Sequence, residues 1–276
     1  TTVTDGTCLL PFVELKTTGS LGPAGGTTRL GLSGLIVRQG TFTAPLNDTL
    51  AIGLPYTTVT NDTILLMAPS TSFNANGGTV YLNACGGGAI AKNIEVDGKI
   101  AFNNLRLNNM STVSTVTYRM MKGDTLFVGG DLTLDGNLLG GTRHACNGGS
   151  GVTGVFEVQG DVKMYTGGYY ANPGILLLSG SKVQNYICPE ASSYGNWGFH
   201  TALNINKTSG KVILKNDFPY YPNCINLYSG VFDMNGKHLD IYDTMYINGV
   251  FIQRDTGHVY LRGGGGNGRV QIGASG

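Results

Sequence analysis

Two copies of one unit decide the fold: Ser229-Gly-Val-Phe-Asp-Met-Asn-Gly-Lys-His-Leu-Asp-Ile-Tyr242 and Asn248-Gly-Val-Phe-Ile-Gln-Arg-Asp-Thr-Gly-His-Val-Tyr-Leu-Arg262. Gly-Val-Phe recurs after 19 positions (230 to 249), and His238 recurs after 20, at His258. Each copy has the pattern short strand, turn, short strand, turn, without helical spacing. A period of about 20 residues with very short strands is typical of one coil of a parallel β-solenoid. Because one coil cannot bury its apolar face alone, the unit predicts further coils above and below it.

Upstream, a glycine followed closely by a β-branched residue recurs at Gly160, Gly180 and Gly210. The steps from Gly160 to Gly180 and from Gly210 to Gly230 are equal, and the step from Gly180 to Gly210 is longer by half. The long step contains residues 188–200, which we interpret as a loop inserted into one coil. Along residues 131–135, the period of two in a strand predicts that the leucines face inward and that Asp131, Thr133 and Asp135 face outward.

Composition supports an all-β protein. The chain has 276 residues, 44 of them glycine, and only 13% are charged. Glu, a good residue for helix surfaces, is rare, whereas Asn, Asp and Gly cluster between β-branched runs as tight turns require. We therefore predict a parallel β-helix (β-solenoid) with loop insertions, and an antiparallel β-sandwich is the alternative. Strands of three to five residues, paired in parallel with the next coil, would indicate the β-helix rather than the antiparallel sandwich.

The chain divides into two parts by this pattern. Residues 1–35 do not fit the repeat, and we interpret them as an N-terminal cap or interaction arm, because the strand edges at the end of a solenoid need cover. Residues 36–276 form the predicted solenoid. The chain begins with Thr1 and its last predicted strand, 269–272, follows a glycine run, so we expect a removed leader or a fragment.

Charge and motifs exclude several classes of function. The net charge is +1 and no basic stripe is present, so nucleic acid is not an expected partner. No apolar run approaches the roughly 18 residues that a membrane helix needs, so we expect no membrane insertion. The glycine-rich segment 139–151 lacks the Lys-Ser/Thr of a phosphate-binding loop. No cofactor is predicted.

The cysteines do not form a metal motif. Five are present, and none belongs to a C-x-x-C pair, so we expect no metal site. Stacked coils lie about 4.8 Å apart, which is within the Cα–Cα range of a disulfide. Cys188 and Cys224 both lie in proline-containing loops and are the first candidates for a bridge, whereas buried thiols are the alternative.

Catalytic candidates are few. Asp131, Asp135 and Asp161 are expected on neighbouring coils, where two carboxylates could reach the roughly 5–9.5 Å separation of a glycosidase pair. The alternative is that these outward carboxylates are simply solvated. His238 and His258 occupy equivalent repeat positions and predict a stacked structural row.

Aromatic residues in the two predicted loops, 186–200 and 215–224, are the best candidates for ligand binding. Tyr and Trp offer flat apolar faces with a polar edge, which suit sugar rings or a protein partner. The residues are Tyr194, Trp197, Tyr220 and Tyr221. The alternative is that they only pack the loops onto the coils.

Two modification patterns are present. The N-x-S/T pattern of N-glycosylation begins at Asn47, Asn61, Asn109 and Asn206. A second pattern, Asp-Thr followed by an aliphatic residue, is centred on Thr49, Thr63, Thr125 and Thr244. This pattern resembles the O-glycosylation site of secreted Bacteroidota proteins, which would make the chain a glycoprotein.

Residues 203–214, Leu-Asn-Ile-Asn-Lys-Thr-Ser-Gly-Lys-Val-Ile-Leu, and 230–239, Gly-Val-Phe-Asp-Met-Asn-Gly-Lys-His-Leu, carry a family likeness. They resemble repeats of the form L-x-I-N-K-T-x-G and G-x-x-D-x-N-G-x-x-L in large secreted β-helix surface proteins of bacteria, especially Bacteroidota. The likeness covers about residues 130–262. It implies a right-handed parallel β-helix and a secreted, cell-surface role as an adhesin or filament material, and it offers no catalytic residues to carry over.

The function expected from these observations is that of a non-enzymatic extracellular structural protein, a surface adhesin or filament subunit. Its partners would be further copies of itself, associating head to tail through residues 1–35, with a glycan or protein ligand as a further possibility. The alternative is a polysaccharide-active enzyme, a lyase or glycoside hydrolase on a β-helix scaffold.

Overall fold

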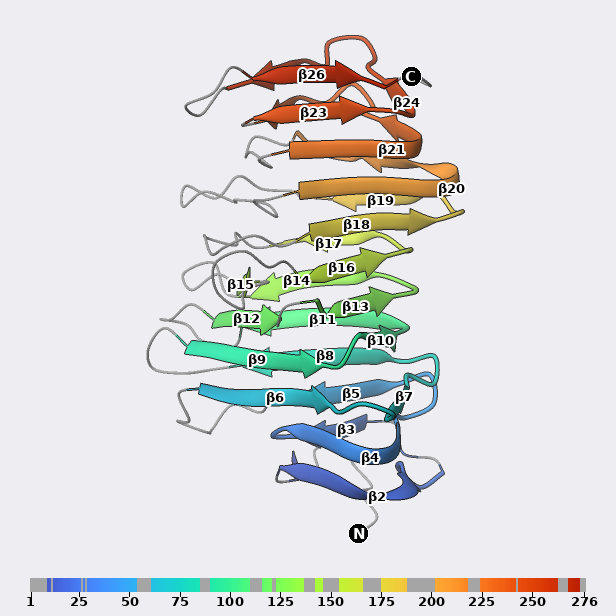
Figure 1. The fold of residues 1–276 in the computed structure, drawn as a ribbon, viewed down its shortest axis with the longest axis vertical. Helices are drawn as coiled ribbons and strands as arrows, with labels where there is room; N and C mark the ends of the chain where they lie inside the picture. The colour runs from blue at the N-terminus through green and yellow to red at the C-terminus, as the bar shows by residue number, and fades with distance from the viewer. Residues whose placement is uncertain are drawn as a thin grey trace.

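The computed structural model describes residues 9–10, 12–25, 27, 29–53, 61–84, 90–109, 116–120, 123–136, 142–145, 154–165, 175–187, 202–217, 224–241, 243–262 and 268–273. Within these ranges every regular element is a β-strand, and every strand pairing is parallel. Strands lie across the long axis of the molecule, one coil above the next (Figure 1). The predicted all-β parallel β-helix is confirmed, and the antiparallel sandwich is wrong.

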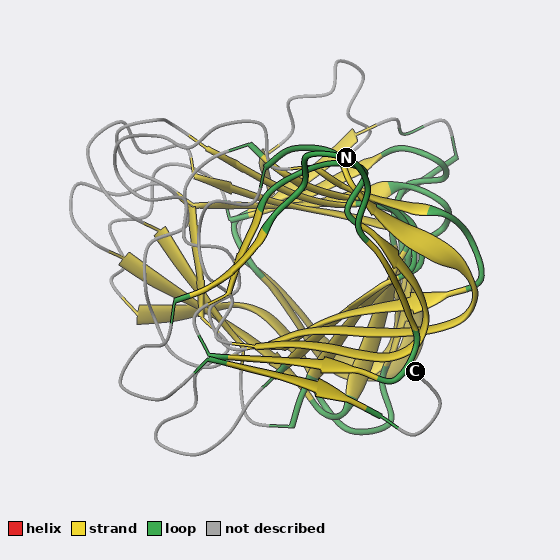
Figure 2. Cartoon of the chain, turned by 90° about the horizontal axis from the view of Figure 1, so that it is seen from above, coloured by secondary structure: helices red, strands yellow, loops and turns green. Residues whose placement is uncertain are grey.

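The strands form three stacks around a closed cross-section (Figure 2). The first stack runs along the whole molecule: β1 (Leu9–Leu10), β3 (Arg29–Leu32), β5 (Thr49–Ile52), β8 (Thr79–Ala84), β11 (Asn104–Asn109), β14 (Leu132–Gly136), β17 (Val162–Met164), β19 (Gln184–Ile187), the second parts of β20 (Ala202–Leu214) and β21 (Cys224–Asp233), and β24 (Val250–Ile252). This stack carries the candidate catalytic carboxylates.

The second stack lies beside it in the C-terminal two thirds of the chain: β10 (Lys99–Phe102), β13 (Thr125–Val128), β16 (Val155–Val158), β18 (Ile175–Gly180), the first parts of β20 and β21, β23 (Thr244–Ile247) and β26 (Arg269–Ile272). Since β20 and β21 bend from one stack into the other, they are 13 and 10 residues long. The expected strand length of three to five residues is wrong for them, for β8, β11 and β18, which have six residues each, and for the longer strands of the third stack.

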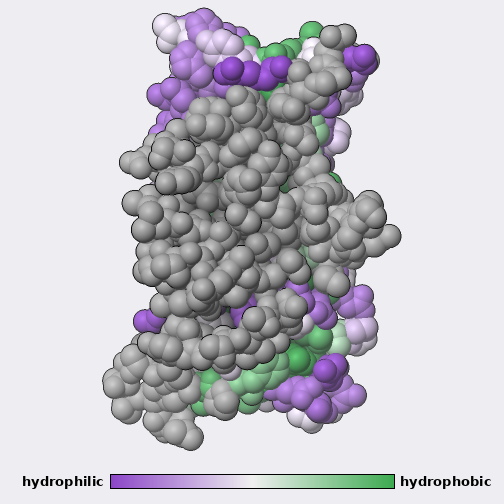
Figure 3. Space-filling view, turned by 90° about the vertical axis from the view of Figure 1, so that its left-hand side faces the viewer, coloured by the Kyte–Doolittle hydropathy of each residue, from purple (hydrophilic) through white to green (hydrophobic). Residues whose placement is uncertain are grey.

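The third stack contains β2 (Val13–Leu21), β4 (Leu35–Thr43), β6 (Asn61–Met67), β9 (Ile90–Val96), β12 (Val116–Met120) and β15 (Thr142–Ala145). β7 (Ser72–Asn74) pairs with the far end of β4, and β22 (Leu239–Ile241) pairs with β25 (Val259–Leu261). On the face shown in Figure 3, described residues are visible mainly at the two ends of the molecule, where polar and apolar side chains adjoin.

The coils are less regular than the repeat predicts. Leu30 pairs with Leu50, and Leu50 pairs with Val80 on the next coil. The coil from Leu50 to Val80 therefore contains half as many residues again as the coil from Leu30 to Leu50. The short period is confirmed where Phe232 pairs with Phe251, because these are the phenylalanines of the two Gly-Val-Phe copies. Gly180 pairs with Lys207, so it does not occupy the position of Gly210, and the uniform glycine series is wrong at this point.

The boundary predicted at residue 35 falls inside the stacked structure. β2 pairs in parallel with β4, and β3 pairs with β5, so described residues before position 35 already belong to coils. Any cap or arm function of this segment stays a prediction.

The interior is filled by stacked apolar side chains. Leu132 and Leu134 are buried, as the alternation predicts, and so are the side chains above and below them. Phe232 packs against Phe251 on the next coil with ring centroids 5.8 Å apart. Gly210 (φ +69°) and Gly230 (φ +85°) adopt left-handed backbone conformations where β20 and β21 bend, which glycine allows at little steric cost.

Candidate functional site

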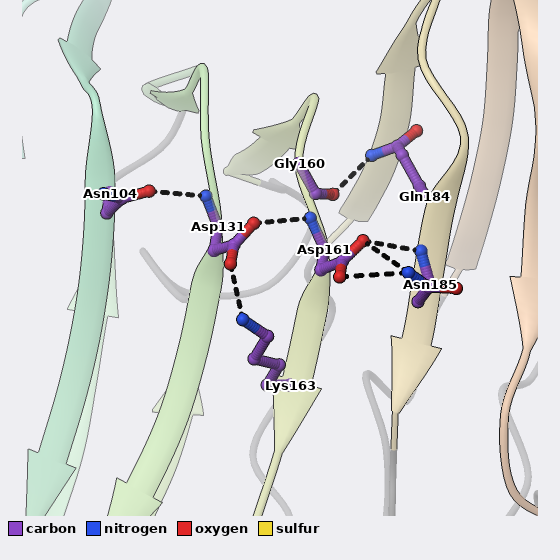
Figure 4. A network of polar contacts seen from close by, with 7 residues as sticks. All are labelled: Asn104, Asp131, Gly160, Asp161, Lys163, Gln184 and Asn185. Atoms are coloured by element: carbon purple, nitrogen blue, oxygen red, sulfur yellow. Dashed lines mark hydrogen bonds and ion pairs between the residues drawn. The ribbon is translucent and has the colours of Figure 1, made fainter.

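Four short polar side chains form a ladder where stacked strands of the first stack begin (Figure 4). The Asn104 Oδ1 atom accepts a hydrogen bond from the Asp131 amide at 2.9 Å, and Asp131 Oδ1 accepts one from the Asp161 amide at 2.9 Å. Asp161 Oδ1 then accepts the Asn185 amide at 2.7 Å. The side chains of Asn104, Asp131 and Asp161 therefore each bind the backbone of the coil above. At a corner, where the strand ladder is interrupted, such side chains supply the partner that a backbone amide needs.

Further polar contacts surround this ladder. Lys163 forms an ion pair with Asp131 Oδ2, and this hydrogen bond raises the pKa of Lys163. The Asn185 side-chain amide donates to both carboxylate oxygens of Asp161, at 3.2 and 3.1 Å. Both aspartates thus have several protein donors, and charge-assisted hydrogen bonds of this kind are among the stronger ones.

The structure places the three predicted carboxylates as follows. Asp131 and Asp161 do lie on adjacent coils, as expected. Asp135 lies on the same coil as Asp131, four residues along, so the expectation that all three lie on neighbouring coils is wrong. Asp135 forms an ion pair with Arg106, on the coil below. All three carboxylates are therefore bonded between coils, and these contacts link each coil to its neighbour.

Behind the ladder lies a polar pair that the sequence analysis missed. The Gln184 side chain donates to the carbonyls of Val158 and Gly160, at 2.9 and 2.8 Å. Its Oε1 atom accepts a hydrogen bond from Lys207, whose ammonium group also donates to the Ser179 carbonyl at 3.0 Å. Lys207 is only 2% exposed, and burial lowers its pKa to about 8. The sequence did contain a signal for this burial. Lys207 continues the alternation of Leu203 and Ile205, in which every second side chain of the strand faces the interior.

A second buried ionic group lies near the bend of β21. Asp233 accepts hydrogen bonds from Lys211 at 3.1 Å and from Arg254 at 2.9 Å, and these residues lie on the coils below and above. Burial alone would raise the pKa of Asp233, but the hydrogen bonds from Arg254 and Lys211 outweigh it and lower the pKa to about 2. This carboxylate is another connection between coils.

The predicted histidine row is confirmed. The rings of His238 and His258 are stacked with centroids 5.3 Å apart and an interplanar angle of 15°. Tyr260 contacts both rings, with centroids 6.2 and 5.9 Å away. The row packs one coil against the next, as equivalent repeat positions predict.

The predicted ligand-binding aromatics, Tyr194, Trp197, Tyr220 and Tyr221, lie outside the described residues, as does Cys188. Cys224 begins β21, and burial raises the pKa of its thiol. Both the aromatic site and the Cys188–Cys224 disulfide stay predictions.

Three of the four Asp-Thr positions lie where a strand begins. Thr49, Thr125 and Thr244 each begin a strand, β5, β13 and β23. The carbonyl of the preceding aspartate accepts the amide of the coil above, at 2.9 Å for Asp48 and 3.0 Å for Asp243. The fourth, Thr63, lies within β6 and donates to Glu95 at 2.6 Å.

The predicted N-glycosylation sites differ in their setting. Asn47 (φ +53°) and Asn206 are exposed, and Asn206 accepts a hydrogen bond from Ser229 at 2.8 Å. Asn61 and Asn109 lie at strand ends in β6 and β11. Glycosylation at all these positions stays a prediction.

The C-terminal coil exposes side chains that lie above the apolar interior. Val270 is 48% exposed, although it stacks on the buried Met245, and Ile272 is 72% exposed above Ile247. Leu261 is exposed above the buried Ile241. A parallel strand with inward apolar side chains, added to β26, would cover this face.

Comparison of the chain with protein-family models, with curated proteins and with solved structures returned no match. In the described ranges no three His, Cys, Asp or Glu side chains gather in a way that could hold a metal ion. The same ranges contain no helix that is long and apolar enough to span a membrane.

Proposed function

We propose that the protein is a non-enzymatic structural rod at the cell surface, an adhesin or filament subunit whose task is to hold a long β-helix rigid. The observation that supports this most is the ladder from Asn104 to Asn185. The two carboxylates best placed by sequence for catalysis, Asp131 and Asp161, each bind the backbone of the next coil. A general acid or nucleophile needs its oxygen free for the substrate, whereas a structural carboxylate needs the bonds observed here.

The rival function, polysaccharide cleavage on the same scaffold, predicts a different response to substitution. The full chain is incubated with a panel of acidic and neutral polysaccharides, and polymer length is measured by size-exclusion chromatography. For a structural rod, no polymer shortens. Depolymerisation that Asp131→Asn or Asp161→Asn abolishes, while circular dichroism shows an intact fold, would establish the enzyme instead.

We further propose that copies of the chain associate head to tail, with the N-terminal coil of one copy on the C-terminal coil of another. Exposed strand edges accept a further strand readily. The exposed apolar side chains of β26 would be removed from water if a strand of another copy packed on them. Such a heterologous contact does not close on itself unless its rotation forms a ring, so it builds filaments.

Lysine on an exposed edge opposes strand addition. Val270→Lys with Ile272→Lys is therefore expected to abolish assembly in sedimentation velocity while leaving the fold intact. Val183→Lys, at an exposed position away from the ends, is the matched control. A wild-type chain that stays monomeric at high concentration contradicts head-to-tail association.

A further inference from the structure

The outward face of the second stack carries an uncharged polar row near the C-terminal end. Asn204, Asn226, Tyr246 and Gln271 occupy one register position on four successive coils, in β20, β21, β23 and β26. These strands lie directly above one another (Figure 1). The Asn226 side chain donates to Asn204 Oδ1 at 2.8 Å, so the row begins as an amide ladder.

Two tyrosines widen this row into a patch. Tyr228 and Tyr246 lie on adjacent coils with ring centroids 6.1 Å apart and an interplanar angle of 51°. Tyr228 is 43% exposed, and Gln271 is exposed at the upper end. Within the described residues neither tyrosine hydroxyl makes a hydrogen bond. One exposed and one half-buried aromatic ring, each with a hydroxyl group, thus lie beside the amides of Asn204, Asn226 and Gln271.

We propose that this patch, Asn204, Asn226, Tyr228, Tyr246 and Gln271, binds a neutral polysaccharide lying along the long axis of the molecule. Tyrosine faces offer apolar area to the faces of sugar rings, and amide groups both donate to and accept from hydroxyl groups. Polar side chains recur at the coil spacing of about 4.8 Å, three of them amides and one the tyrosine Tyr246, so a polymer of repeated units meets hydrogen-bonding groups again on successive coils.

The chemistry of the patch favours this ligand over the other classes. None of the five side chains is charged, so an anionic polymer gains no ion pair from them. A protein interface is normally centred on fully desolvated anchors in apolar surroundings, whereas here Tyr228 is 43% exposed and the two tyrosines lie beside three amides. The proposal is independent of the structural role, because a rod can bind a glycan whether or not it assembles.

Affinity gel electrophoresis of the full chain tests the proposal, with mannan, dextran and hydroxyethyl cellulose in the gel and polygalacturonate as the anionic comparison. At least one neutral polymer is expected to retard the wild type. Tyr228→Ala with Tyr246→Ala is expected to weaken this retardation at least about tenfold, since exposed aromatic anchors dominate such contacts. Tyr260→Ala, a tyrosine of similar exposure on β25, is the matched control and is expected to bind normally.

A second variant, Asn204→Asp, keeps the size of the side chain but places a charge in the row, and it is expected to weaken binding as well. Circular dichroism and the urea midpoint check that each variant folds. The proposal is overturned if no neutral polymer retards the wild type, if only polygalacturonate does, or if both the double tyrosine variant and Asn204→Asp bind like the wild type. Filament formation, measured separately by sedimentation, is expected to be unchanged in these variants.

Discussion

Replacing Asp161 by alanine removes the last link of the polar ladder, the one to Asn185. Asp161 accepts the Asn185 backbone amide at 2.7 Å and two contacts from the Asn185 side chain. A hydrogen bond to a charged group contributes about 1.5–3 kcal/mol, but Asp161 is only partly buried, so water can replace the side-chain contacts. We therefore expect the free energy of unfolding to fall by about 2–3 kcal/mol, mainly from the unpaired Asn185 amide.

Urea denaturation followed by circular dichroism measures this loss, and hydrogen exchange locates it. Asp161→Asn keeps an oxygen acceptor and is expected to lose only about 1 kcal/mol. Exchange of the Asn185 amide is expected to accelerate in Asp161→Ala, whereas amides of β3 and β5 stay protected. A loss below about 0.5 kcal/mol, the lower end of what one ordinary hydrogen bond contributes, would refute the reasoning that the carboxylate holds the next coil in place. Equal losses in both variants would refute it too.

Two further predictions concern Lys207 and Gly210, which lie close to the bend in β20. Because the pKa of Lys207 is about 8 in the folded chain and 10.5 in the unfolded chain, the unfolded chain binds this proton more tightly, and stability is expected to rise by up to about 3 kcal/mol from pH 8 to pH 10.5. Lys207→Met is expected to remove this rise in urea titrations across that window, and an unchanged slope contradicts the assignment. At Gly210 (φ +69°), an added Cβ would lie 2.5 Å from the Ser181 carbonyl oxygen, so Gly210→Ala is expected to cost about 2 kcal/mol or more in thermal or urea unfolding. Gly25→Ala, where nothing lies within 4 Å, is the control, and equal costs at the two sites would contradict the steric argument.

Sequence patterns predicted the features that depend on spacing within one short coil or along one strand. The Phe232–Phe251 and His238–His258 pairs follow directly from the short unit that the sequence contains twice. The burial of Leu132 and Leu134 follows from alternation along one strand. These features depend only on local spacing.

Other features depend on how coils of different length align. Gln184 pairs with Val212 across a coil that is longer than this unit, and nothing in the spacing of the glycines shows that Gly180 pairs with Lys207. The role of Asp161 could not be predicted either, because its partner Asn185 lies on a coil whose register the sequence left open. Outward position alone does not distinguish a solvated carboxylate from one that binds the next coil.

The orientation of the strands also determines how the rod responds to mechanical load. Since the strands lie across the long axis, tension along that axis pulls neighbouring coils directly apart, and the boundary with the fewest bonds gives way first (Figure 1). Among the described residues of the first stack, the boundary between β17 and β19 has two paired positions, Val162 with Tyr186 and Lys163 with Ile187, and the boundary between β1 and β3 also has two. Asp161 and Gln184 bridge the same boundary with their side chains. Under tension these side-chain bonds share the load with the few backbone bonds of the first stack at this boundary.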